Sequence, residues 1–202
     1  SQVVQSRIKK YYRRDSIGIY PPAGIKNYEL RITNQDSVNC KLETRNFYLI
    51  VSRLHRYKNI DIAIEAFNKL NYPLVIIGAG PDRGRLEKMA GRNIVFLGEQ
   101  SDSTLAGYYA SCRAFIMPQE EDFGLTPIEA MSFGKPVVAL RKGGALETIL
   151  EGQTGEFFDD PIPEALADAV RRLNENYANY NPEKIKARAT KFSAEVFRQS
   201  II

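Results

Sequence analysis

Glu121 and Glu129 stand eight positions apart, on either side of the place where an acidic loop turns into a helix. We expect Glu121 to precede the helix start and Glu129 to lie about one turn inside the helix. A carboxylate accepts two hydrogen bonds, which suits the two neighbouring hydroxyls of a ribose. The alternative is one acid that stabilises the helix start and one that is solvated at the surface.

The start of this helix is itself an expected binding site for an anion. Phe123, Gly124 and Leu125 stand immediately before Thr126, near which the helix is predicted to begin. Free N–H groups and the helix dipole favour phosphate at such an end. The backbone amides of these three residues are therefore expected to face a phosphate group.

A second loop, residues 52–59, carries two cations and follows an apolar run that is typical of a strand. Its cations are Arg53 and Lys58. A guanidinium fork and an ammonium point charge could converge on a diphosphate, in the place where other proteins hold a metal ion. The alternative is that both cations are solvated, as charged side chains in polar loops usually are.

The apolar pattern predicts the strands and helices that position both loops. Amphipathic stretches over Ile60–Leu70, Ser103–Ser111 and Glu164–Leu173 predict helices. The expected strands are Phe47–Val51, Pro73–Ile77, Asn93–Leu97, Ala114–Met117, Pro136–Leu140 and Gly155–Phe158. This alternation predicts an α/β fold with a doubly wound, Rossmann-like parallel sheet, whose ligand lies beyond the carboxyl ends of the strands.

The first 45 residues do not follow this alternation. Ser1–Tyr12 has one apolar face and predicts a helix, Ser16–Tyr20 predicts a short strand, and Tyr28–Arg45 is polar with weak periodicity. We therefore divide the chain into residues 1–45, with a helix, a short strand and an irregular lead-in, and residues 46–202, the Rossmann-like domain. Because the chain begins inside a helix and without methionine, we expect it to be part of a longer protein.

Composition excludes several classes of protein. The 202 residues carry 28 Lys+Arg and 24 Asp+Glu, and the mild net charge of +4 predicts no nucleic-acid partner. His55 is the single histidine, which excludes multi-histidine zinc sites and Ser-His-Asp catalysis centred elsewhere. No apolar run approaches the roughly 20 residues of a membrane-spanning helix. Cys40 and Cys112 suggest no disulfide framework, so we expect a cytoplasmic protein.

The two loops together resemble the C-terminal domain of family 4 glycosyltransferases, retaining enzymes of the GT-B fold. The matching residues are Ser52-Arg53-Leu54, Lys58, Glu121-Asp122-Phe123-Gly124-Leu125, Glu129-Ala130-Met131, Gly134, Pro136-Val137-Val138, Gly143-Gly144, Glu147, Gly152-Gln153-Thr154-Gly155 and Phe192-Ser193-Ala194-Glu195. They stand in the family's order from Tyr48 to the end. The stretch Glu120–Thr148 is especially similar to bacterial and archaeal mannosyltransferases of polysaccharide and O-antigen assembly.

The resemblance implies metal-independent transfer of a hexose from a nucleotide sugar to a glycan or glycolipid, with retention at the anomeric carbon. It implies catalytic roles for Arg53 and Lys58 at the diphosphate and for Glu121 at the sugar hydroxyls, with Glu129 at the ribose. GDP-mannose is the first donor expected and a UDP-hexose the second.

The resemblance also places the acceptor site on an N-terminal domain that this chain lacks. Residues 1–12 resemble the segment just after the interdomain crossing, and Phe192–Ile202 resembles the start of the terminal helix that returns across it. The chain alone is therefore expected to be inactive. The full-length protein could make peripheral contact with the inner face of a membrane.

One motif suggests a different cofactor. The turn Gly78-Ala79-Gly80-Pro81 resembles the opening of a flavin- or NAD-binding strand, but Arg83 occupies the place of the third glycine and Gly84 comes one position too late. The same turn occurs in the glycosyltransferase family, where it lets the backbone approach the donor. Gly78 and Gly80 are therefore expected to be donor-binding residues.

Some alternatives remain open. Asp159-Asp160 could be a metal-binding pair, although Pro161 favours a turn and a helix entry. Tyr108 and Tyr109 lie in an expected helix, where aromatic residues more often pack than stack on a base. Two other functions remain as alternatives to a glycosyltransferase: a non-catalytic nucleotide-sugar-binding domain and a GT-B nucleotide-sugar epimerase.

Overall fold

A six-stranded parallel sheet forms the centre of the protein. The computed structural model describes residues 1–23 and 46–201, and their sheet has the order β3-β2-β1-β4-β5-β6 with every pairing parallel. The strands are β1 (Tyr48–Val51), β2 (Leu74–Ile77), β3 (Ile94–Gly98), β4 (Ala114–Met117), β5 (Val137–Leu140) and β6 (Gly155–Phe158). Each of the six expected strands is confirmed, and with them the doubly wound parallel sheet.

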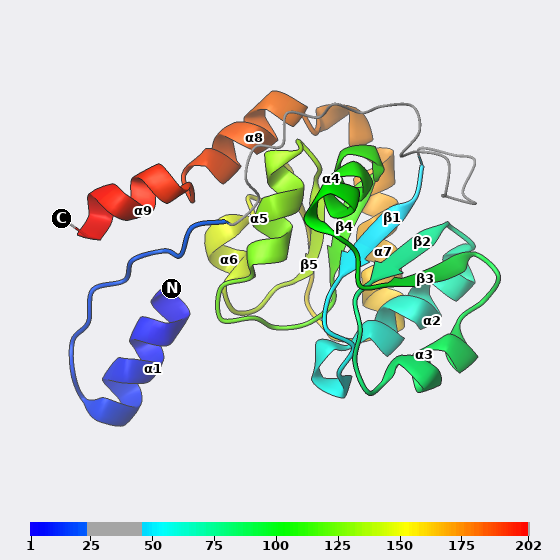
Figure 1. The fold of residues 1–202 in the computed structure, drawn as a ribbon, viewed down its shortest axis with the longest axis horizontal. Helices are drawn as coiled ribbons and strands as arrows, with labels where there is room; N and C mark the ends of the chain where they lie inside the picture. Colours follow the sequence, from blue (N-terminus) through cyan, green and yellow to red (C-terminus); the bar gives the residue numbers. More distant parts are fainter. Residues whose placement is uncertain (24–45, 202) are drawn as a thin grey trace.

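Helices cover both faces of this sheet (Figure 1). They are α1 (Gln2–Tyr12), α2 (Ile60–Leu70), α3 (Arg83–Met89), α4 (Asp102–Ser111), α5 (Leu125–Ser132), α6 (Ala145–Thr148), α7 (Pro163–Glu175), α8 (Pro182–Thr190) and α9 (Ala194–Ile201), with the 3-10 turns η1 (Arg56–Lys58) and η2 (Tyr177–Asn179). Helix α2 packs on α7 over one face, and α4 packs on α5, and α5 on α8, over the other. The expected helices over residues 60–70, 103–111 and 164–173 are confirmed.

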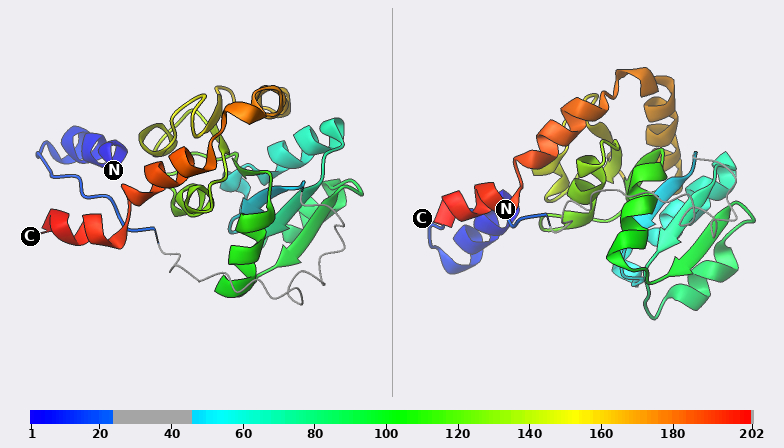
Figure 2. Two further views of the ribbon diagram at one scale, coloured as in Figure 1. Left: turned by 90° about the horizontal axis from the view of Figure 1, so that it is seen from above. Right: turned by 45° about the horizontal axis from the view of Figure 1, so that its top comes forward.

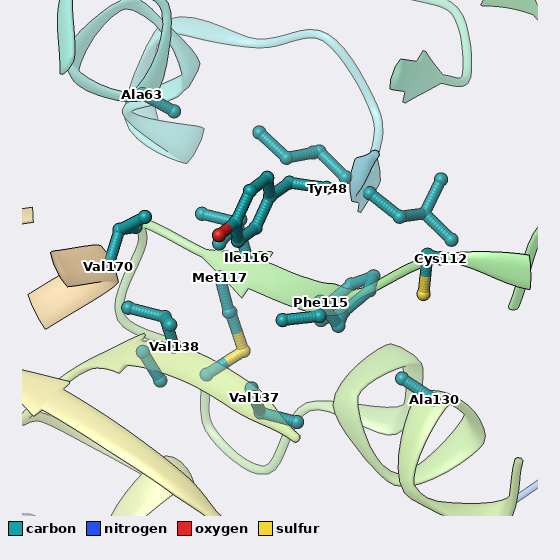
Figure 3. Close-up of a cluster of buried hydrophobic side chains, with 14 of the residues drawn as sticks. Tyr48, Ala63, Cys112, Phe115, Ile116, Met117, Ala130, Val137, Val138 and Val170 are labelled. Carbon is teal, nitrogen blue, oxygen red and sulfur yellow. The ribbon is translucent and has the colours of Figure 1, made fainter. Parts of the chain in front are cut away.

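The core lies on both sides of β4 and β5, because parallel strands that are covered twice are apolar on both faces. Figure 3 shows Ile116 and Met117 of β4 between Ala63 of α2 on one side and Ala130 of α5 on the other. All of these side chains are at most 1% exposed. The sheet therefore holds the loops at its carboxyl end on a rigid base.

Helices α1 and α9 project from the same side of this layered body (Figures 1 and 2). The Glu147 carboxylate holds the start of α1, because it accepts hydrogen bonds from the backbone N–H groups of Gln2 at 2.9 Å and Val3 at 3.2 Å. A carboxylate at a helix start also opposes the positive end of the helix dipole. The expected helix over residues 1–12 and the terminal helix after Phe192 are both confirmed.

The expected short strand Ser16–Tyr20 is wrong. Residues 13–23 have no regular secondary structure, and Ile17 is 91% exposed. The Tyr20 ring stacks on Phe123 with centroids 5.2 Å apart and meets Phe192 edge-on at 5.4 Å. The Tyr20 ring thus contacts other rings, and the segment pairs with no neighbouring strand of the described chain, which a strand would need for its backbone hydrogen bonds.

The expected irregular lead-in over residues 28–45, with Cys40, lies outside the described residues. Within the described part of the chain, no helix is both long and apolar enough to cross a bilayer.

Candidate active site

The sheet reverses its winding between β1 and β4. These strands are neighbours, yet β2 and β3 lie on one side of them and β5 and β6 on the other. The chain therefore leaves β1 and β4 toward opposite edges, and a crevice opens beyond their carboxyl ends. The loops that follow these two strands are the two that sequence analysis singled out, residues 52–59 and residues 118–124.

Lys58 reaches across this crevice. It ends η1, the 3-10 turn within the loop after β1, and is only 6% exposed. Its Nζ forms an ion pair with Oε1 of Glu121 and lies 4.9 Å from the centre of the Tyr57 ring. Buried charges are stable only when they are paired. The two loops are thus joined by one lysine and one glutamate from opposite halves of the sheet.

Glu121 is held through one of its two oxygens. Gln119, 4% exposed, donates from Nε2 to the same Oε1 at 3.0 Å. Within residues 1–23 and 46–201, no group donates to Oε2 of Glu121, and Oε1 of Gln119 is buried without a hydrogen-bond partner. The side chain of Glu121 is 27% exposed, so Oε2 remains available to a ligand. Sequence analysis gave no role to Gln119, because an amide beside three acids carries no distinctive spacing.

Arg53 does not join this pair in the structure. Its side chain is exposed, and its nearest partner is the hydroxyl of Tyr57 at 3.4 Å. The structure therefore brings Lys58 and Glu121 together, whereas the Arg53 side chain, near the start of the same loop as Lys58, stays apart from them. An exposed arginine can still turn toward an anion, since its side chain has many rotamers of similar energy.

The start of α5 is open to a ligand. Gly124 precedes the first helical residue with φ 85°, and no side chain caps the helix. Leu125 begins the helix and is 40% exposed, whereas the Phe123 ring is 7% exposed and packs edge-on against Phe192 at 5.5 Å. The ring anchors the loop in the core while the backbone amides of the helix start keep their unpaired hydrogen-bonding capacity.

Glu129 lies in α5, where its side chain meets α4. The hydroxyl of Tyr109 donates to its Oε2 at 2.9 Å. Burial raises the pKa of Glu129, and the hydrogen bond from Tyr109 counters this in part, while the charge of Asp102 adds to the increase. Glu121 thus precedes α5 and Glu129 lies within it, and a buried side chain of the protein holds each of them.

The glycine turn after β2 packs against the loop after β1. A Cβ on Gly80 would lie 2.3 Å from the carbonyl oxygen of Leu54, and one on Gly78, whose φ is +131°, would lie 2.0 Å from that of Ser52. The N–H of Leu54 donates to Ala79 O at 2.8 Å. Both glycines are thus required by the approach of two loops at the carboxyl edge, which places the turn beside Arg53.

A second pair of glycines supports the acidic loop. The N–H of Gly144 donates to the carbonyl of Glu121 at 2.8 Å, and a Cβ on Gly144 would lie 2.3 Å from Cα of Phe123. Three residues later, Glu147 holds the start of α1. Gly144 and Glu147 are among the residues that resemble the family, but their spacing in the sequence predicts neither of these contacts.

A cavity of about 480 Å³ opens beside the ion pair. Helix α1 contributes Arg7 to its wall, and Arg7 forms an ion pair with Asp122 and lies 3.6 Å from an oxygen of Glu120. The other residues that line it are Tyr57, Asn59, Glu121, Leu140, Lys142 and Pro161. No sequence signal pointed to Arg7, because it lies 113 positions before Glu120 in the chain.

Residues 32–192 match the family described as group 1 glycosyl transferases. The chain belongs to this family. Its parallel-sheet domain is the Rossmann-like domain of a GT-B glycosyltransferase, as the resemblance of its motifs implies.

Mannosyltransferases are among the relatives of this chain. It is 26% identical over 198 residues to O-antigen chain mannosyltransferase C of Escherichia coli, covering 92% of this chain and 53% of the relative. It is 33% identical over 150 residues to the GDP-mannose-dependent alpha-(1-6)-phosphatidylinositol monomannoside mannosyltransferase of Mycolicibacterium smegmatis, covering 65% of this chain and 39% of the relative. The chain spans about half the length of the curated relatives it matches.

Solved glycosyltransferase structures share the fold. Sucrose-phosphate synthase from Thermosynechococcus elongatus aligns with a TM-score of 0.85 at 22% identity, over 100% of this chain and 55% of the other. HepE of Anabaena, in complex with UDP-glucose, aligns with a TM-score of 0.68 at 25% identity, over 77% of this chain and 47% of the other.

Arg83 stands where a dinucleotide-binding turn would need its third glycine, and Gly84 comes one position later. A Cβ added at Gly84, in α3, would meet no atom within 4 Å. Gly84→Ala is therefore expected to raise the free energy of unfolding by about 0.5–1 kcal/mol, because alanine loses less backbone entropy in a helix. Denaturant unfolding measures this gain, and calorimetry should show unchanged affinity for GDP or UDP. A lower free energy of unfolding or a weaker affinity for these nucleotides would mean that position 84 needs glycine.

Three other residues that the sequence raised as candidates, Asp159, His55 and Cys112, have structural surroundings that account for them. Asp159 lies in a bend and forms an ion pair with Arg141 at 2.6 Å, which agrees with a turn before α7. His55 lies in the loop after β1 beside the Tyr57 ring, 5.6 Å between centroids. Cys112 is 1% exposed, and burial raises its pKa to about 12, so its thiol is a packed side chain. Among the described residues, no cluster of three potential ligands could hold a metal ion.

Proposed function

We propose that this chain binds the nucleotide-sugar donor of a retaining glycosyltransferase, with GDP-mannose as the donor and a UDP-hexose as the second candidate. The observation that carries the proposal is the pairing of Lys58 with Glu121 at the switch point of the sheet. A cation for a diphosphate and a carboxylate for sugar hydroxyls lie side by side there. The mannosyltransferase relatives support mannose, and HepE in complex with UDP-glucose supports a UDP-hexose.

The diphosphate would lie between the loop after β1 and the start of α5. An ammonium group carries three donors, so Lys58 can keep Glu121 and still donate to phosphate oxygens. The amides of Phe123, Gly124 and Leu125 would contact the same oxygens, and Arg53 would turn in from the mouth of the loop. The glycine turn Gly78–Gly80 holds that loop in place.

The two carboxylates would bind the two ends of the donor. Oε2 of Glu121 would accept from the hydroxyls of the transferred sugar, and Glu129 would accept from the ribose. In the transfer, the acceptor oxygen would bond to the anomeric carbon on the face from which the diphosphate leaves. The electron pair of the broken carbon–oxygen bond would go to the diphosphate oxygen, which would take up the proton of the acceptor hydroxyl. Lys58, Arg53 and the helix amides would stabilise that charge, which is the role that preorganised donors have in many enzymes.

We place the acceptor site on a part of the protein outside this domain. The chain spans about half the length of its relatives, and the resemblance of its motifs implies an acceptor site on an N-terminal domain. The chain by itself is therefore expected to bind the donor without transferring sugar to a glycan or lipid-linked acceptor.

A thermal-shift panel tests the proposal. GDP, UDP and ADP, each with and without mannose or glucose attached, are added to the chain, and a ligand at a hundred times its Kd stabilises the folded protein by about 2.7 kcal/mol. We expect GDP and GDP-mannose to give the largest shifts, and the same shifts in EDTA as in magnesium, because cations of the protein face the diphosphate. No shift with any of the three nucleotides would rule out a donor site.

A further inference from the structure

Glu129 has one oxygen that the protein occupies and one that it leaves open. Oε2 accepts the hydrogen bond from the Tyr109 hydroxyl at 2.9 Å, and within the described chain nothing donates to Oε1. A carboxylate that is free to rotate would offer either oxygen to a ligand. Here the bond to Tyr109 fixes the plane of the carboxylate and so determines which oxygen is available.

Tyr109 is itself fixed by packing. Its side chain is fully buried, its ring stacks on Phe133 with centroids 5.8 Å apart and 11° between planes, and it meets Phe115 of β4 at 5.9 Å. A ring that is stacked on one neighbour and packed against another in a close-packed core has little room to move. The hydroxyl therefore stands at a constant position relative to α5, and the Glu129 carboxylate accepts from a rigid donor.

Burial and nearby charges determine which group donates in the hydrogen bond between Tyr109 and Glu129. Burial raises the pKa of Tyr109 well above its ordinary value, and the nearby Glu129 charge adds to it, so the hydroxyl keeps its proton and remains the donor. Burial also raises the pKa of Glu129, with a smaller contribution from Asp102, and the Tyr109 bond lowers it. The Cys112 thiol donates to the backbone carbonyl of Tyr109 at 3.4 Å. It is neutral, since burial raises its pKa to about 12, while the charge of Lys135 opposes that increase.

We propose that Tyr109 is a positioning residue for the donor nucleotide: it holds Oε2 of Glu129 so that Oε1 is left to accept from the ribose hydroxyls. This inference rests on the proposed ribose contact of Glu129. The sequence predicted only a packing role for Tyr109. Packing explains why the ring of Tyr109 is buried, but it does not explain the hydrogen bond from its hydroxyl to Glu129.

Tyr109→Phe tests the inference, because phenylalanine keeps the ring and removes only the donor. We expect the affinity for GDP to fall about tenfold at pH 7, since a hydrogen bond to a charged group is lost. The affinity for inorganic pyrophosphate, which has no ribose, should not change. The fall in GDP affinity on acidification should begin at a higher pH than in the unaltered chain, because Glu129 loses the bond that lowers its pKa. Calorimetric titration between pH 5 and 8 measures the affinity for GDP, the affinity for pyrophosphate and the pH at which GDP affinity begins to fall.

Tyr48→Phe is the matched control. Tyr48 is also a buried tyrosine with a raised pKa. Its hydroxyl donates to Asn174 of α7 at 2.7 Å, on the face of the sheet that α2 and α7 cover, away from α4 and α5. This variant is expected to bind GDP as the unaltered chain does. If it lost GDP affinity as much as Tyr109→Phe, the loss would reflect general destabilisation, and the inference would be wrong.

Two further outcomes are distinguishable. If Glu129→Gln weakened GDP binding while Tyr109→Phe did not, the ribose contact would stand and the positioning role would fall. If neither variant changed GDP affinity, the ribose contact itself would be wrong. The double variant Tyr109→Phe/Glu129→Gln should bind GDP no more weakly than Glu129→Gln, since residues that act through one another are not additive. Additive losses would overturn the inference even if both single variants bound poorly.

Discussion

Lys58→Met is expected to weaken the binding of a nucleoside diphosphate by about a hundredfold. Methionine keeps the length of the buried stem and removes a charge-assisted contact to the diphosphate, worth roughly 1.5–3 kcal/mol. The bare nucleoside should bind as before, because it carries no phosphate. The difference between variant and unaltered chain should shrink at high salt, since the Debye length falls from about 10 Å at 0.1 M to about 3 Å at 1 M.

The same substitution has a second effect that must be separated from binding. Lys58 is the partner of Glu121, whose side chain is 27% exposed, so the variant leaves a partly buried carboxylate unpaired. We expect the free energy of unfolding to fall by about 2 kcal/mol, below the cost of a fully buried pair because water reaches Glu121. The double variant Lys58→Met/Glu121→Gln removes both charges and should recover stability without recovering diphosphate affinity.

Lys88→Met is the charge-matched control for Lys58→Met. Lys88 is exposed on α3, so this variant changes the net charge equally and should bind GDP normally. Calorimetry with guanosine, GDP and GDP-mannose, at low and high salt, measures the three affinities. Equal weakening of guanosine and GDP by Lys58→Met would contradict the diphosphate contact and indicate a general loss of structure.

The doubly wound sheet could be predicted from the sequence because its signal is local. An apolar run such as Leu74–Ile77 is buried on both faces, and that pattern identifies a strand without knowledge of its neighbours. Ser16–Tyr20 shows the limit of this reasoning. Its residues have a strand-like composition, yet a strand forms only where another backbone supplies hydrogen bonds, and Tyr20 meets rings instead.

The candidate site could be predicted only as two separate loops. Sequence order placed Lys58 after β1 and Glu121 after β4, but their pairing depends on the order of strands in the sheet, which no single loop encodes. Contacts from Tyr109 and Arg7 were missed for the same reason, since each comes from an element far from its partner in the chain. In each case the missing information was the position of a rigid element.

Arg7 shows how a helix outside the layered body can affect the site. It pairs with Asp122, the residue after Glu121, while Glu147 binds the N–H groups at the start of the same helix. Burial raises the pKa of Tyr20, and a hydrogen bond with Glu147 raises it further, so the segment after α1 is tied to the same acid. The position of α1 is thus coupled to the loop that carries Glu121 through the pair of Arg7 with Asp122. Glu147 fixes the start of the same helix.

Glu129→Gln is expected to weaken the binding of nucleoside, nucleoside diphosphate and nucleotide sugar alike, by about tenfold or more. Glutamine keeps the shape of the side chain, but its amide offers one acceptor oxygen, and the hydrogen bond from Tyr109 competes for it. The ribose hydroxyls then lose charge-assisted acceptors worth roughly 1.5–3 kcal/mol each. Because the ribose is uncharged, the loss should vary little with salt, in contrast to Lys58→Met.

The pattern across ligands is what identifies the ribose contact. Glu121→Gln should leave GDP bound as before and weaken GDP-mannose, because Glu121 would meet only the sugar, whereas Glu129→Gln should weaken both. Glu65→Gln on α2 removes an exposed acid on a helix of the other face and should change none of these affinities. If Glu129→Gln bound guanosine, GDP and GDP-mannose as tightly as the unaltered chain, Glu129 would be a helix-surface acid, and the raised pKa that burial gives it would have no part in donor binding.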